Sequence, residues 1–512
     1  MEVELKLVLD PKFKDALMRH PLLSGKTASK PHEQTVADTY FDTPDLQLRQ
    51  SDIGLRVRRV NGGWVQTIKR GTTVNGGVHT RNEWESPVNG AVPELGRLRD
   101  VVDDKATRRD VRHAATNGKG LAAVFTTKVK RTAWELRPAE GDHIECALDQ
   151  GRLECGSKSA AINEIEFELK SGDPIHLFDL ALALQKDIPL QIGNQSKADR
   201  GYALFEAKPP AAVKATRLEL TADMSAEQAF QEIASNTMAQ IQANAEGVVE
   251  RHDVESLHQM RVGMRRLRSA LSMYNRLLHL PQDLQQELDW LATELGDARD
   301  WDVLAGSTLP AVAKDLPNTA ELDGLRMAAA GKAEEHHVAT AAAVASPRYT
   351  RLMLSVNRWV QAKGWQDEQQ IINKAGKKLA EPVTKFARAT LKRDQRRLRA
   401  RADNLSEATP EARHRVRIAA KKTRYAAEFF GSLFSPKRVR PYIKSLTGLQ
   451  DELGLLNDAT VADKLLSDMP AAQPQLMANV SFVKGFLAAR TMNDDKQIVR
   501  LWKRFERIGT LS

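Results

Sequence analysis

Cysteine, aromatic side chains and long apolar runs are all scarce in this chain. Its 512 residues include two cysteines, Cys146 and Cys155, which favours reduced thiols in a reducing compartment over a disulfide framework. Aromatic residues make up only 5%, which is low for an all-β protein and typical of a largely helical one. No run of about 18 apolar residues occurs, and the N-terminus has no apolar signal stretch. We therefore expect a soluble, cytoplasmic protein without a membrane partner.

Charge of one sign is in excess. The chain has 76 Lys and Arg against 66 Asp and Glu, a net charge of +10. This excess favours an anionic partner: nucleic acid, a phosphate polymer or a membrane surface. Hydrophobic residues make up 42%, enough for well-packed cores, and the length favours more than one domain.

Two halves differ in pattern. Residues 1–205 alternate polar and apolar side chains as strands do, with hairpin signals such as Asn75-Gly76-Gly77. Eight strands are expected, which favours an antiparallel sheet or closed barrel; they are residues 3–9, 35–43, 54–60, 62–69, 79–86, 125–136, 143–151 and 162–170. A linker follows at 206–217, around Pro209 and Pro210. Residues 218–508 have helical spacing and open on a capping box, Ser225 with Gln228.

Charged side chains share one face of most of the expected strands. In MEVELKLVLD, Glu2, Glu4 and Lys6 point one way, and the apolar residues point the other way. For one strand this pattern usually marks a solvated face. When six or more strands repeat it and the sheet closes, the charges line a lumen, which is costly unless they are paired or bind ligands. Arg and Lys suit phosphate, and clustered carboxylates suit a hard divalent cation, so the pattern indicates a site for metal and polyphosphate.

The helical half repeats itself. His-x-x-Arg-x-x-x-[Arg/Lys]-[Arg/Lys]-x-Arg occurs from His258 and again from His414, and each copy precedes a related segment that contains Gly296 or Gly454. Two ordered matches indicate a duplication, and we expect two half-domains related by a pseudo-two-fold axis. In each copy four basic residues share one helical face, which predicts an anion-binding surface rather than a metal site. These residues are His258, Arg261, Arg265, Arg268, His414, Arg417, Lys421 and Arg424.

The charged residues of the N-terminal half resemble those of the CYTH superfamily, the triphosphate tunnel metalloenzymes. The resemblance spans about residues 1–205 and rests on an ordered series of short motifs: Glu2-x-Glu4-x-Lys6, YFDT at 40–43, Leu55-Arg56-x-Arg58, Thr67-x-Lys69, Arg81-x-Glu83, Arg131, Asp149, Glu164-x-Glu166 and Ser196-Lys197. It implies an eight-stranded antiparallel tunnel that binds a triphosphate end-on with Mg²⁺, or else Mn²⁺.

The resemblance also implies roles for single residues. The implied substrate ligands are Lys6, Arg56, Arg58, Lys69, Glu83, Arg131 and Lys197. The implied metal ligands are Glu2, Glu4, Asp149, Glu164 and Glu166, and Glu168 could replace Glu164 because the register of that strand is open. The implied catalytic set is Glu2, Glu4, Lys6, Lys69 and Arg131.

The helical half resembles the CHAD family, which implies a two-lobed helical bundle that binds inorganic polyphosphate. The order CYTH then CHAD resembles bacterial inorganic triphosphatases. We therefore expect a multidomain protein, α+β then all-α, that hydrolyses inorganic triphosphate in the cytoplasm, with polyphosphate granules as an associated location. The alternatives are adenylate cyclase chemistry in the same tunnel and a non-catalytic polyphosphate scaffold. Nucleic acid is disfavoured, because few aromatic residues accompany the basic helices and could stack on a single strand. Binding to the phosphates of a double strand stays open, and so does the oligomeric state.

Overall fold

The computed structural model describes the chain except residues 61, 117–119, 208–210, 316–318, 367–371, 404, 406–407, 473, 492–494 and 512. The chain divides into two compact units. The first comprises Met1–Ala211 and Ala345–Ala362, and the second comprises Ala212–Val344 and Lys363–Ser512. Pro209 and Pro210 of the expected linker lie outside the described residues, and the boundaries 1–205, 206–217 and 218–508 stay a prediction.

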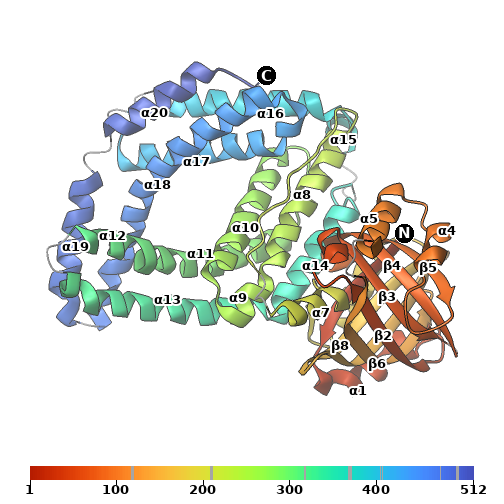
Figure 1. Ribbon diagram of the computed structural model, residues 1–512. Helices are drawn as coiled ribbons and strands as arrows, with labels where there is room; N and C mark the ends of the chain where they lie inside the picture. The colour runs from red at the N-terminus through yellow and green to blue at the C-terminus, as the bar shows by residue number, and fades with distance from the viewer. Residues whose placement is uncertain are drawn as a thin grey trace. The chain divides into compact units, whose positions relative to one another are not determined.

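The first unit is built on a closed antiparallel barrel (Figure 1). Within the described residues eight strands pair in the order β5-β4-β3-β2-β6-β7-β8-β1, and β1 pairs with β5 to close the ring. The strands are β1 (Glu2–Leu9), β2 (His32–Asp42), β3 (Ile53–Val60), β4 (Gly63–Asn75), β5 (Val78–Val88), β6 (Ala122–Leu136), β7 (His143–Cys155) and β8 (Lys158–Ser171). The eight predicted strands are all present, so the predicted fold class is confirmed.

One further strand was not predicted. β9 (Leu190–Ile192) has three residues and pairs with the end of β1, opposite Leu7, Val8 and Leu9. It is too short to show an alternating pattern. The hairpin between β4 and β5 forms as predicted, with Gly76 and Gly77 both at positive φ. A side chain at Gly77 would collide with Ile192, so this turn lies directly against β9.

The barrel is apolar outside and charged inside. Leu5 and Leu7 of β1 point outward and are fully buried in a core that also contains Phe178 of helix α6. Their neighbours Glu4 and Lys6 point inward. The covering helices of this unit are α1 (Lys14–Met18), α2 (Pro21–Ser24), α3 (Gln47–Gln50), α4 (Leu95–Val101), α5 (Lys105–Thr116), α6 (Ile175–Leu184) and α7 (Lys197–Glu206). Burying the apolar face under helices leaves the charged face for the lumen.

A helix from far along the chain completes this core. α14 (Pro347–Gln361) lies within the range expected for the helical domain, yet it packs with the first unit. Leu354 is fully buried in the same core as Leu5 and Leu7. The Gln185 side chain donates a 2.8 Å hydrogen bond to the Pro347 carbonyl, and Arg358 forms an ion pair with Asp179 of α6. The barrel core therefore includes residues on both sides of the expected boundary.

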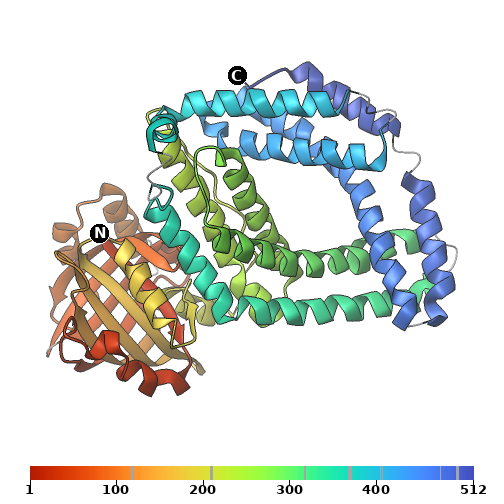
Figure 2. The ribbon, with the colours of Figure 1, turned by 180° about the vertical axis from the view of Figure 1, so that it is seen from behind.

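The second unit is helical in its described residues (Figures 1 and 2). Ser225 and Gln228 form the predicted capping box at the start of α8. The helices are α8 (Ala226–Ala243), α9 (Ala245–Arg251), α10 (Val254–Tyr274), α11 (Gln282–Val303), α12 (Leu309–Lys314), α13 (Asp323–Val344), α15 (Ile372–Leu379), α16 (Val383–Arg401), α17 (Pro410–Phe429), α18 (Pro436–Ala472), α19 (Met477–Thr491) and α20 (Asp495–Ile508). Among the described helices, none combines the length and the apolar character needed to cross a membrane.

Candidate active site and candidate anion-binding cluster

The inward faces of the strands surround one cavity of about 610 Å³. Its wall carries both signs of charge, because alternate residues of each strand project into the lumen. Ten of the predicted site residues line it: Glu2, Glu4, Lys6, Arg56, Arg58, Lys69, Glu83, Arg131, Glu166 and Lys197. Ionised groups this deep need partners of opposite charge, and the structure shows what those partners are.

Three buried carboxylates form one cluster. Asp149 of β7 lies opposite Glu164 of β8, and Glu166 follows two residues later on the same face. One oxygen from each lies within 4.8 Å of the others, close enough for a single cation. Glu164 and Glu166 belong to this cluster, while Glu168 lines the cavity apart from it, so which glutamates would hold a metal stays a prediction. Carboxylate oxygens are the donors that Mg²⁺ and Mn²⁺ prefer, so the cluster fits such an ion.

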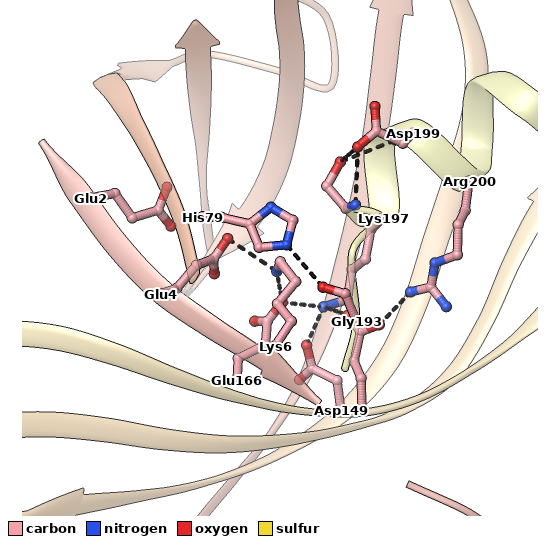
Figure 3. Close-up of polar contacts among 12 residues, drawn as sticks. Glu2, Glu4, Lys6, His79, Asp149, Glu166, Gly193, Lys197, Asp199 and Arg200 are labelled. Carbon is pink, nitrogen blue, oxygen red and sulfur yellow. Dashed lines mark hydrogen bonds and ion pairs between the residues drawn. The ribbon is translucent and has the colours of Figure 1, made fainter. Parts of the chain in front are cut away.

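The ammonium of Lys197 reaches the same three carboxylates (Figure 3). Its Nζ lies 2.6 Å from Asp149 Oδ2, 2.5 Å from Glu164 Oε1 and 2.9 Å from Glu166 Oε1. Lys197 is the first residue of α7, where Ser196 and Asp199 form a capping box that fixes the helix start. Burial lowers the pKa of Lys197, but the three carboxylates outweigh it and hold that pKa well above its ordinary value.

Glu2 and Glu4 also pair with cations, as the clustered carboxylates do, and their role as metal ligands stays a prediction. Glu2 is 2.9 Å from Lys69 and 2.6 Å from Arg81, and Glu4 is 3.0 Å from Lys6. Burial raises the pKa of Glu2, but Lys69 and Arg81 outweigh it and hold that pKa well below its usual value. Glu2 and Glu4 thus form ion pairs with three cations of the wall, which are Lys6, Lys69 and Arg81.

The remaining cations are held in the same way. Arg131 binds Asp149 through two parallel contacts of 2.7 Å each and reaches Glu166 at 2.7 Å. Arg58 binds Asp38 with contacts of 2.6 and 2.9 Å, and Arg56 lies 3.5 Å from the same carboxylate. Each predicted phosphate ligand is therefore aimed into the lumen by a neighbouring acid.

Sequence reasoning missed several members of this network, among them Arg200, which pairs with Glu164, and also Arg81 and Asp38. Arg81 shares a face with Glu83 and lies between Glu2 and Glu4, but the sequence assigned it no role. Asp38 holds Arg56 and Arg58, and it is paired with Arg58 across the β2–β3 ladder. A usable signal was that Asp38 shares a strand face with Tyr40, which lines the cavity, and lies opposite Arg58 of the next strand, where an acid and an arginine form a cross-strand ion pair.

The two basic motifs of the helical unit approach each other on α10 and α17. Arg261 lies 2.8 Å from Asp300 of α11, and Arg417 donates a 3.0 Å hydrogen bond to Asn457 of α18. The two contacts are similar but not identical: Asp300 and Asp458 each lie four residues after the shared glycine, and Arg417 binds Asn457, the residue before Asp458. Burial and the cations Arg417, Arg265 and Arg261 lower the pKa of Lys421 to about 7. Arg261, Arg265, Arg417 and Lys421 therefore form one cluster, called here the repeat cluster.

The other motif residues are arranged differently. Arg268 lies 3.0 Å from Asp289, and Arg424 bonds to Gln450 at 2.9 Å. Burial lowers the pKa of His258, and so do the nearby Arg299 and Arg265. His414 is exposed. His258 and Arg424 thus lie near Arg265 at the edge of the repeat cluster, while Arg268 pairs with Asp289.

Comparison with known proteins agrees with this architecture. Residues 1–202 match the CYTH domain, and residues 232–467 match the CHAD domain. An inorganic triphosphatase of Haemophilus influenzae is 32% identical over 204 residues, which are 40% of this chain and 54% of that protein. The match thus spans about half the length of that relative. A thiamine-triphosphatase of Macaca fascicularis is 32% identical over 168 residues, which are 32% of this chain and 67% of that protein.

The helical unit also has a solved counterpart. The crystal structure of the CHAD domain from the plant Ricinus communis is 38% identical, with a TM-score of 0.51, over 57% of this chain and 96% of that domain. The predicted resemblances are confirmed by the two domain matches. The chain belongs to the proteins that join an N-terminal CYTH domain of the triphosphate tunnel type to a C-terminal CHAD domain.

Proposed function

We propose that the tunnel hydrolyses inorganic triphosphate to diphosphate and phosphate with the help of a divalent cation. The observation that carries this proposal is the buried cluster of Asp149, Glu164 and Glu166, faced by cations that line the same cavity. A site for an anion alone would gain nothing from three clustered carboxylates. The inorganic triphosphatase relative supports the choice of substrate.

The three carboxylates would hold the ion, Mg²⁺ or Mn²⁺. When bound, it would offset phosphate charge and make a coordinated water more acidic. The phosphate oxygens would bind the wall cations, which are Lys6, Arg56, Arg58, Lys69, Arg131 and Lys197. Charge that shifts to the leaving diphosphate would then meet fixed cations in a poorly solvated lumen. Glu2 and Glu4 would keep Lys6 and Lys69 in position.

Binding would exchange partners rather than create unpaired charge. Lys197 and Arg131 are paired with the carboxylate cluster. A metal ion would take over the carboxylates, and the triphosphate would take over the two cations. Both ligands would then favour the same rearrangement, so each should bind more tightly when the other is present.

The test is phosphate release from inorganic triphosphate, ATP and thiamine triphosphate, with Mg²⁺, with Mn²⁺ and with chelator. Glu166→Gln removes one member of the cluster, and Glu168→Gln is the matched control in the same cavity. We expect metal-dependent release from inorganic triphosphate that Glu166→Gln abolishes and Glu168→Gln retains. Cyclic AMP formed from ATP would favour the cyclase alternative, and no turnover of any substrate would favour the scaffold.

We propose that the repeat cluster binds inorganic polyphosphate. Its four cations come from two helices, and the lowered pKa of Lys421 reflects positive charge that an anion would neutralise. Arg261→Ala combined with Arg417→Ala should weaken polyphosphate binding at least tenfold and leave triphosphate hydrolysis unchanged. Arg326→Ala with Lys332→Ala on α13 is the charge-matched control. Unchanged affinity in the first variant would move the binding surface elsewhere. Such binding would also bring the protein to polyphosphate granules.

A further inference from the structure

Helix α16 carries a dense positive charge that the two repeated motifs do not include. Between Val383 and Arg401 it has eight Lys and Arg residues and one acid, Asp394. The net charge of this one helix is thus a large part of the chain's +10. Asp394 is buried and pairs with Arg393, so it neutralises little of the exposed face.

Five of these cations form a single exposed line, called here the α16 stripe. They are Lys385, Arg388, Lys392, Arg396 and Arg399, all exposed. At 100° per residue they fall within an arc of about 80°, and the line from Lys385 to Arg399 is about 21 Å long. The opposite face is apolar and buried through Val383, Ala387, Leu391 and Leu398. The stripe is therefore exposed to solvent along the length of the helix.

The stripe lacks the acids that usually accompany exposed basic residues. Among the described residues, Arg388, Lys392, Arg396 and Arg399 have no carboxylate within ion-pair distance, and Lys385 pairs with Glu381 before the helix. Successive members lie three or four residues apart, where like charges repel each other. A solvated helix face ordinarily alternates the two signs. A line of five cations, four of them without a paired acid in the described part of the chain, indicates a surface that suits a polyanion.

The chemistry of the stripe favours a uniform linear anion. The exposed residues beside its cations include Ala389 and Ala400, and no aromatic ring or amide that could stack on or read a base lies on its arc. Guanidinium groups at regular spacing suit successive phosphate groups. We propose that the α16 stripe binds inorganic polyphosphate and extends the contact surface for long chains beyond the repeat cluster. This inference rests on the proposed function of the helical domain.

The test compares two full-length variants that each lose three charges. One is Arg388→Gln, Lys392→Gln, Arg396→Gln in the stripe, and Gln keeps a good helix-forming side chain there. The control is Lys105→Gln, Arg109→Gln, Arg112→Gln on α5, where all three residues are exposed. The probes are long-chain polyphosphate, inorganic triphosphate and duplex DNA, each titrated at several salt concentrations. Unchanged circular dichroism would verify folding of both variants.

We expect the stripe variant to bind long-chain polyphosphate at least tenfold more weakly than the control variant. The slope of log affinity against log salt should fall by about 2, because three phosphate contacts are lost. Hydrolysis of triphosphate should not change. Equal losses in the two variants, or no loss in the stripe variant, would overturn the proposal. Stripe-dependent binding of duplex DNA that exceeds binding of polyphosphate would overturn the assigned ligand.

Failure of the stripe is distinguishable from failure of the repeat cluster. If Arg261→Ala with Arg417→Ala abolishes polyphosphate binding and the stripe variant binds normally, the proposal for the repeat cluster is supported and the proposal for the stripe is refuted. If the stripe variant loses polyphosphate binding and the repeat-cluster variant binds normally, the stripe alone is the binding surface. A wild-type protein that binds no polyphosphate overturns both proposals and leaves the tunnel proposal untouched.

Discussion

The ammonium of Lys197 lies 2.6 Å from the carboxylate of Asp149, at the centre of three acids that could hold a metal ion. In the proposed metal site, a metal ion and this ammonium would therefore compete for the same oxygen atoms. The competition is local, since the capping box at Ser196 fixes the start of α7 and leaves the long Lys197 side chain to move.

Removing that ammonium should strengthen metal binding. We expect Lys197→Met to bind Mg²⁺ roughly tenfold more tightly, because no ammonium then competes for the carboxylates. A tenfold change corresponds to about 1.4 kcal/mol in the free energy of binding. The same variant should hydrolyse triphosphate more slowly, because a phosphate ligand is gone. Calorimetric titration with Mg²⁺ in phosphate-free buffer measures the first effect. Lys170→Met is the control, since Lys170 pairs at 2.7 Å with Glu168, outside the cluster; weaker Mg²⁺ binding in Lys197→Met would contradict the competition.

Glu4→Gln should abolish turnover in a folded protein. The amide keeps the volume but removes the charge that holds Lys6 and Arg81. We expect kcat to fall by about 100-fold or more, the loss typical when one preorganised charged contact is removed from an active site. Steady-state phosphate release and thermal unfolding measure the two properties. Full activity in a folded Glu4→Gln protein would refute a role for this wall in catalysis.

Polyphosphate affinity should depend on pH through Lys421. Burial, followed by Arg417, Arg265 and Arg261, lowers the pKa of this ammonium to about 7, and Asp458 of α18 opposes the shift. The side chain therefore loses its proton as the pH rises through 7. A bound polyanion favours the charged form, so binding takes up a proton and the affinity should fall by up to about tenfold per pH unit above 7.

Lys421→Arg tests the origin of that dependence. Arginine keeps its charge throughout this range, so its affinity profile should be nearly flat between pH 7 and pH 9. Fluorescence titration of labelled polyphosphate at a series of pH values gives both profiles. The same slope in the two proteins would assign the pH dependence to another group.

Leu354→Ala should destabilise the barrel although Leu354 lies more than 100 residues beyond its last strand. The side chain is fully buried with Leu5 and Leu7, and its truncation should cost about 2–5 kcal/mol in the free energy of unfolding of the first unit. Urea unfolding measures this cost. Leu455→Ala on α18 is the control, because Leu455 is exposed and its truncation should change stability little. Equal effects of the two substitutions would mean that α14 does not stabilise the barrel.

Much of the site was visible in the sequence because strand periodicity is local. Glu2, Glu4 and Lys6 must share a face in any extended strand, and Arg56 with Arg58 must do the same. The helical duplication was visible for a similar reason, since both motifs repeat one spacing. The sequence by itself therefore determined the eight strands, the charged faces and the two basic motifs.

Only the tertiary structure decided how these pieces meet. Which face of a strand turns inward depends on ring closure and on the covering helices. The pairing of Asp149 with Lys197, the place of Asp38 beneath two arginines and the separation of Arg268 from the repeat cluster all join residues distant in sequence. The inclusion of α14 in the barrel core has the same origin. Such contacts form wherever burial and charge pairing are most favourable across the whole chain, and no local pattern contains that information.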